Sequence, residues 1–264
     1  MASTPLVSRD LDAAREAFKH GDLEASRAAH AQQEAHQSEE GAYAKSVIFG
    51  ALDGMLTGFA VVCATDGGGL SWEVVPTVGV ASVLAGAISM GVGEYLGSIA
   101  ETEHALEERK REQWELNSNP DGEKQEMVEI FTGKGMSDVD AKSVIDTLAK
   151  YEDLFLEIML KHELGLDTPD DGADLDALKQ GGVMFGAFFF FGVLPLLPYI
   201  YAKLRGAEVP WAFACASGLT ALELFGMGAS KAVLSHRHWA ATGFESLLLG
   251  GLAAAAAWLA ASVF

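Results

Sequence analysis

The chain has 264 residues, half of them hydrophobic, and a formal net charge of −19. This acidic balance argues against nucleic acid as a partner and favours the attraction of cations. Because the mean hydropathy is nevertheless positive, at +0.19, the charge must be segregated from the apolar sequence, as in a membrane protein with polar domains.

Residues 1–42 form a polar, alanine-rich tail whose first nine residues contain no apolar stretch, so we expect no cleavable secretory signal. Residues 22–40 predict a helix. On it, His30 and Glu34 lie four positions apart and could share a metal ion. The alternative is an exposed regulatory tail, which we favour because no second helical pair supports a metal site.

Five segments are long enough to cross the hydrocarbon core of a bilayer, which takes about 20 apolar residues. The loop after the first segment has no Lys or Arg, whereas residues 101–163 carry eight. The positive-inside rule therefore places the amino terminus and the long loop in the cytosol. The five segments are residues 46–66, 74–98, 181–203, 209–231 and 243–264.

These patterns predict an all-α membrane protein with five transmembrane helices and a three-helix cytosolic metal-binding domain between spans two and three. We expect spans one and two within residues 43–100, the acidic domain at 101–180 and spans three to five at 181–264. The preceding tail is residues 1–42.

The first span contains a ladder of small residues, Gly50, Gly54 and Gly58, which permits close helix approach. We expect it to pack against the partner subunit. Asp53 lies about a third of the way into this span, where a carboxylate needs a partner, a proton or a cation. A structural contact between helices is the alternative.

Residues 83–115 pass from apolar to acidic sequence without a proline and predict one helix that leaves the bilayer and continues into water. At about 100° per residue, one narrow stripe carries Met90 and Glu94 and then further glutamates. A solvated acidic face is the alternative for its aqueous end. Glu94 lies so close to apolar sequence that we expect a functional role, because carboxylates at membrane depth are costly.

Later spans hold two further features. Pro195 and Pro198 predict a kink or an end in the third span. Glu223 in the fourth span is a secondary proton or ion candidate, with an interhelical hydrogen bond as its alternative.

The acidic domain predicts three helices. The second runs from Pro120 to Gly133 with Asn119 as its cap, and the third runs from Ser137 to Gly165. Two Glu-x-x-Glu pairs each place two carboxylates on one helix face, and a methionine lies four residues before a glutamate on the third helix. Mixed oxygen and thioether donors suit a divalent transition metal. The expected ligands are Glu112, Glu115, Glu123, Glu126, Met159 and Glu163.

Two stretches resemble signatures of the vacuolar iron transporter family: residues 49–54 (FGALDG) and 85–96 (AGAISMGVGEYL). The likeness extends from about residue 43 to 264 and includes the six expected ligands. It implies a homodimer with a path between the subunits and exchange of metal for protons. The chain departs from the family at Leu160, where a second methionine is common, and at Ser82, where well-known members carry a glutamate.

We therefore predict a transporter that moves ferrous iron, and manganese, from the cytosol into an acidic organelle such as the vacuole, through Asp53, Met90 and Glu94. Zn²⁺ is a further expected ligand; the other partners are lipid, protons and a second copy of the chain. A membrane-anchored iron buffer or sensor is one alternative. A di-iron carboxylate oxidase is another, but it needs two Glu-x-x-His motifs and only residues 101–104 supply one.

Overall fold

The computed structural model describes residues 11–30, 43–169, 172–235 and 238–263, and the chain forms two compact units, residues 1–45 and 46–264. In the first unit, α1 (Leu11–His20) packs against α2 (Leu23–His30). The predicted helix over residues 22–40 corresponds in part to α2, whereas α1 was not predicted. Glu34 lies outside the described residues, so its pairing with His30 stays a prediction.

All regular secondary structure in the described part of the larger unit is helical, without a strand, and five helical segments are long and apolar enough to span a membrane. The number and approximate positions of the predicted spans are confirmed. The spans are α3 (Ala44–Gly67), α4 (Val74–Ser118), α8 (Ala173–Val193) continued by α9 (Leu197–Arg205), α10 (Ala212–Ser235) and α11 (Trp239–Val263).

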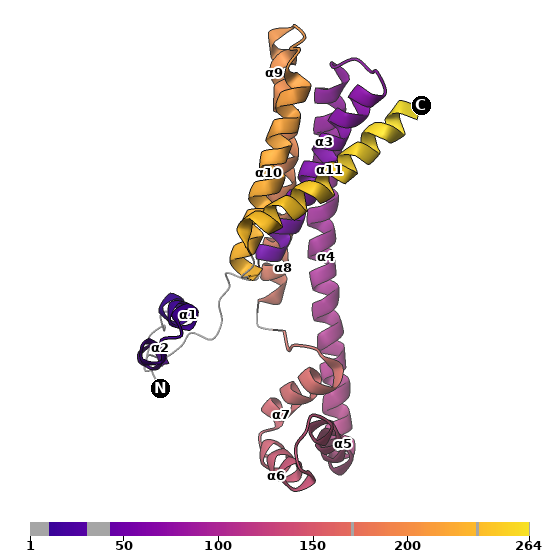
Figure 1. Ribbon diagram of the computed structural model, residues 1–264. Coiled ribbons are helices and arrows are strands. Elements are labelled where there is room, and N and C mark those ends of the chain that lie inside the picture. The colour runs from indigo at the N-terminus through magenta and orange to yellow at the C-terminus, as the bar shows by residue number, and fades with distance from the viewer. Residues whose placement is uncertain (1–10, 31–42, 170–171, 236–237, 264) are drawn as a thin grey trace, which may run out of the picture. The chain divides into compact units, whose positions relative to one another are not determined.

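The second span is a single helix of 45 residues. At 1.5 Å per residue it is about 68 Å long, more than twice the hydrocarbon thickness of about 30 Å. Figure 1 shows α4 extending well beyond the other spans and meeting α5–α7 at its far end. The predicted continuous helix from apolar into acidic sequence is confirmed.

The glycine ladder of α3 packs against α8 of the same chain. A β-carbon at Gly54 would lie 2.2 Å from the carbonyl oxygen of Phe188, and one at Gly58 would lie 2.1 Å from that of Gly192. The two backbones are therefore in direct contact, which only glycine permits. The expectation that this ladder packs against the partner subunit was wrong, because α8 itself offers a small residue, Gly192, at the contact.

At the prolines of the third span, α8 ends and the chain passes through a short 3₁₀ turn into α9. Pro195 lies in a 3₁₀ turn, Leu194–Leu196, and the chain continues as α9 to Arg205. Pro198 sits in the first turn of α9, where its missing N–H removes no intrahelical hydrogen bond.

The acidic helices form a small domain with its own apolar core. Helix α5 (Pro120–Gly133) begins as predicted, since the Asn119 side chain accepts a hydrogen bond of 3.3 Å from Gly122 N. Helix α6 (Asp138–Leu148) begins where Ser137 Oγ accepts a hydrogen bond of 3.2 Å from Asp140 N. Both caps are confirmed.

The prediction of one unbroken third helix was wrong. Helix α6 ends at Leu148, and residues 149–151 interrupt the helix. The chain resumes as α7 (Glu152–Met159) and closes with a π-helical turn, Leu160–Leu164. Ile145 and Phe155 pack in the same core cluster, although ten residues of straight helix would separate them by about 15 Å. The break allows Ile145 and Phe155 to contact the same core. The helical segment ends at Gly165, with φ of +71°, as predicted.

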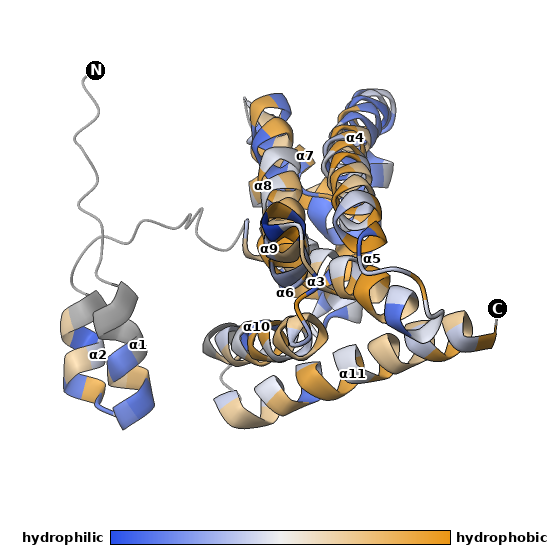
Figure 2. Ribbon diagram, turned by 90° about the horizontal axis from the view of Figure 1, so that it is seen from above, coloured by the Kyte–Doolittle hydropathy of each residue, from blue (hydrophilic) through white to orange (hydrophobic). Residues whose placement is uncertain are grey.

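The membrane helices are apolar on their outer as well as their inner faces. Figure 2 shows hydrophobic residues around α8, α10 and α11, with α10 and α11 side by side. Large apolar residues of α11 are exposed, among them Phe244, Leu248, Leu249, Leu252 and Leu259. A surface of this kind requires lipid, so the protein is an integral membrane protein.

Candidate metal centre

Three glutamates from three elements converge in the small domain. Glu112 comes from α4, Glu123 from the first turn of α5, and Glu163 from the π-helical turn after α7. One carboxylate oxygen of each lies within 4.8 Å of the others. We call these three residues the glutamate trio. Each predicted Glu-x-x-Glu pair contributes one member to the trio, Glu112 from the first pair and Glu123 from the second.

Two members of the trio are buried, the third, Glu163, is partly buried, and the trio is short of hydrogen-bond partners. The side chain of Glu112 has no exposed surface, and Glu123 is 9 % exposed. Within the described residues, the Oε2 atoms of Glu112 and Glu163 are buried without a hydrogen-bond partner. Buried carboxylate oxygens without partners are costly, and a bound cation would satisfy them. The donor set fits a divalent metal ion.

The carboxylates also oppose one another electrostatically. Burial, reinforced by the charge of Glu163, raises the pKa of Glu112 to about 7. Burial also raises the pKa of Glu123, with Glu115 and Glu126 adding to the effect. The pKa of Glu163 is raised by burial and then by Glu126 and Glu123. Without a metal the trio therefore holds protons more readily than free glutamate.

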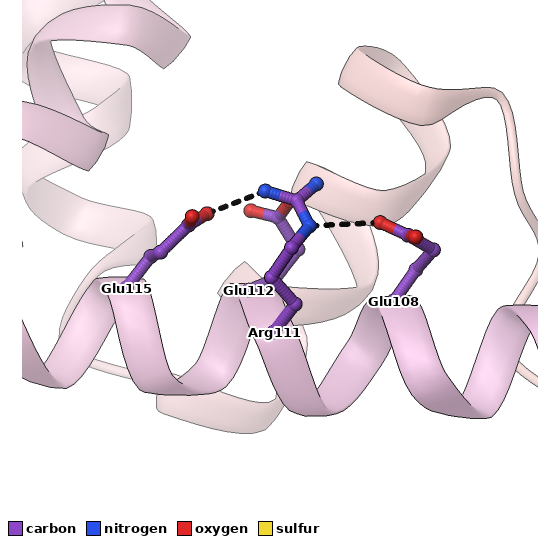
Figure 3. Close-up of polar contacts among 4 residues, drawn as sticks. All are labelled: Glu108, Arg111, Glu112 and Glu115. Atoms are coloured by element: carbon purple, nitrogen blue, oxygen red, sulfur yellow. Dashed lines mark hydrogen bonds and ion pairs between the residues drawn. The ribbon is translucent and has the colours of Figure 1, made fainter.

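Arg111 joins this cluster and was not predicted. Its Nε donates to Glu108 at 2.9 Å, its Nη1 donates to Glu115 at 2.7 Å, and its Nη2 donates to Glu112 Oε1 at 2.5 Å. Figure 3 shows the guanidinium between Glu108 and Glu115, with Glu112 beside it. Two of these contacts could have been read from the sequence, since Glu108 and Glu115 lie at i−3 and i+4 from the arginine.

The remaining predicted ligands lie around the trio. Glu115 is held by Arg111, and Glu126 is exposed, although its charge acts on Glu123 and Glu163. Met159 is fully buried in the apolar cluster of the small domain. Their metal ligation stays a prediction. The trio contains no histidine, and both Glu101 and His104 are exposed, so nothing in this cluster favours the di-iron oxidase.

A hydrogen bond joins the first two membrane-spanning helices, α3 and α4. Ser46 Oγ donates to Glu94 Oε1 at 2.9 Å, a contact that sequence reasoning missed. Asp53 follows Ser46 by seven residues, which is two turns and about 20° away on the same face of α3. Met90 precedes Glu94 by one turn on α4 and packs against the apolar core. The short loop after α3 makes the two helices antiparallel, so Asp53 and Met90 both lie on the same side of the Ser46–Glu94 contact along the helices.

Glu223 on α10 is a further carboxylate on a membrane-spanning helix. Both of its oxygens are buried and, within the described residues, have no hydrogen-bond partner. The interhelical hydrogen bond considered as its alternative role is therefore not formed within that part of the chain. Its role as a proton or ion group stays a prediction.

Comparison with known proteins gives one consistent result. The profile of the VIT family matches residues 44–262. A protein of Toxoplasma gondii named vacuolar iron transporter is 42 % identical over 237 residues, covering 84 % of this chain and 78 % of that protein. A protein of the same name from Plasmodium berghei is 34 % identical, covering 91 % of both chains. Vacuolar iron transporter 1 of Arabidopsis thaliana is 33 % identical, covering 84 % of this chain and 86 % of that protein.

Proposed function

Because the chain belongs to the VIT family, we propose that it transports ferrous iron, and also manganese, from the cytosol into a vacuole or another acidic organelle. The relatives are named as vacuolar iron transporters, and this naming supports the substrate and the compartment.

One observation carries this proposal: helix α4 holds both Glu112, a buried member of the trio, and the residues Met90 and Glu94 of its apolar part. A buffer would need only the trio. The same helix continues into the membrane, where the Glu94 carboxylate accepts a hydrogen bond from Ser46 of α3. This arrangement suits a protein that collects a cation at the trio and then passes it into the membrane.

The choice of metal follows from the donor atoms. Carboxylate oxygens bind hard and borderline cations, and a thioether adds preference for a borderline transition metal. The proposed route offers Met90 between Asp53 and Glu94, and the small domain offers Met159 one turn before Glu163. This set suits Fe²⁺, Mn²⁺ and Zn²⁺ better than Mg²⁺ or Ca²⁺.

The direction and the coupling are proposed on charge grounds. The concentration of Lys and Arg between spans two and three supports a cytosolic position of the small domain and the amino terminus. Asp53 and Glu94 bind a cation when ionised and release it when protonated on the acidic side of the membrane. Such a cycle exchanges metal for protons.

We further propose a homodimer in which α3 and α4 of both subunits line the path. Asp53, Met90 and Glu94 are all only partly buried in the single chain, which leaves their side chains accessible to a second copy. The glycine ladder already packs against α8, so the interface must use another face of α3.

The test is uptake of Fe²⁺ into proteoliposomes under reducing conditions, with and without an acidic interior. We expect uptake that is stimulated by the proton gradient and weakened when the glutamate trio is changed to glutamine. The exposed Glu157→Gln in the same domain serves as the matched control. Metal binding without any uptake would instead support the membrane-anchored buffer.

A further inference from the structure

We propose that Arg111 is a built-in cation that competes with the transported metal for the carboxylates of the small domain and so keeps the metal weakly bound. This inference rests on the proposed function, because it assumes that the glutamate trio binds the metal. It assigns to Arg111 a tuning role rather than a ligand role.

The contacts of Arg111 engage one member of the glutamate trio, Glu112. Its three donor nitrogens each contact a different carboxylate: Nε contacts Glu108, Nη1 contacts Glu115, and Nη2 contacts Glu112 at 2.5 Å (Figure 3). Glu112 thus belongs both to the arginine network and to the trio. A metal that takes Glu112 through both oxygens must displace the guanidinium from Oε1.

The charge of Arg111 acts in the same direction. A guanidinium stays protonated at all physiological pH values, so it neutralises part of the acidic cluster whenever no metal is present. Without Arg111, less positive charge would offset the repulsion among the carboxylates. The binding of a divalent ion would then be more favourable. Arg111 therefore stabilises the metal-free state and repels an arriving cation.

The Arg111 side chain is also exposed enough to move away from Glu112. Arg111 is 42 % exposed, whereas Glu112 is fully buried and Glu115 is 33 % exposed. The guanidinium can leave Glu112 and stay paired with Glu108 and Glu115 at the surface, so exchange does not require the domain to unfold. A transporter benefits from this arrangement, since a site that passes an ion onward must release it as well as bind it.

The test compares Mn²⁺ affinity of the full-length protein in detergent at pH 8, where protonation of the cluster does not mask the effect. We expect Arg111→Gln to bind Mn²⁺ about tenfold more tightly than the wild type, equivalent to about 1.4 kcal/mol. Arg111→Lys keeps the positive charge but loses the planar guanidinium with its several N–H donors. Its Mn²⁺ affinity should therefore lie between that of the wild type and that of Arg111→Gln. Lys110→Gln is the matched control, because it removes one charge from an exposed pair with Glu107 and should bind as the wild type does.

Thermal unfolding of the same variants separates tuning from a structural role. Without metal, the melting temperature of Arg111→Gln should be lower than that of the wild type. In saturating Mn²⁺, it should equal or exceed the melting temperature of the wild type. Affinity equal to or weaker than that of the wild type would overturn the proposal, and so would a lower melting temperature that Mn²⁺ does not restore. If Glu112→Gln, Glu123→Gln and Glu163→Gln together leave Mn²⁺ binding unchanged, the metal centre itself is refuted and the inference falls with it.

Discussion

The affinity of the small domain for metal should depend steeply on pH, because a metal ion binds the ionised carboxylates and must displace their protons. Glu112 is the informative residue. Burial and the neighbouring Glu163 raise its pKa to about 7, so it is largely protonated at pH 5.5 and largely ionised at pH 7.5.

The magnitude follows from proton competition at this one group. The apparent dissociation constant grows by the factor 1 + 10^(pKa − pH), which is about 33 at pH 5.5 and about 1.3 at pH 7.5 for a pKa of about 7. Affinity should therefore fall about 25-fold over this interval from Glu112 alone. The raised pKa values of Glu123 and Glu163 act in the same direction.

The same shift predicts the sign of a stability change. Because the folded pKa of Glu112 lies above its unfolded value, the contribution of this residue to the stability of the metal-free fold is fully present below about pH 4.5 and is lost as the pH rises through about 7. Added metal should offset the loss at the upper end of this range, where the carboxylates are ionised.

The assay is Mn²⁺ binding to the full-length protein in detergent at several pH values between 5.5 and 8.5. Glu112→Gln should weaken binding at pH 7.5 and flatten the profile, whereas the exposed Glu157→Gln should retain the wild-type profile. An affinity that changes less than twofold between pH 5.5 and 7.5 would refute the assignment of Glu112 as a ligand with a raised pKa.

Two further predictions concern the membrane helices. Gly54→Ala places a methyl group against the backbone of α8 and should destabilise the protein by about 1–3 kcal/mol, measured as a lower melting temperature in detergent. Gly186→Ala on α8 meets nothing within 4 Å and should be tolerated; equal stability of the two variants would contradict the packing described. Asp53→Asn should abolish Fe²⁺ uptake into liposomes without unfolding the protein, and Met90→Leu should slow it less severely. Ser82→Ala should transport normally, since Ser82 lies about 80° from the Met90 direction, and normal uptake by Asp53→Asn would exclude the proposed path.

The sequence by itself determined the structural features that depend only on residues near one another in the chain. Hydropathy places the five spans, because a bilayer requires about 20 consecutive apolar residues whatever their neighbours are. The absence of proline between residues 83 and 115 predicts the continuous α4 helix. The Asn119 and Ser137 caps follow from side chains that satisfy backbone groups a few residues away. The stripe through Met90 and Glu94 required only helical periodicity.

The tertiary structure alone decided which surfaces meet. The glycine ladder of α3 shows that a close neighbour exists, but only the position of Gly192 identifies that neighbour as α8. The break between α6 and α7 separates residues that share one core, among them Ile145 and Phe155. Likewise, the spacing of the glutamates favoured pairs, whereas three helices bring one glutamate each into a trio. Whether side chains from different helices meet depends on how the helices cross and pack. A periodic pattern along one helix predicts neither the crossing nor the packing.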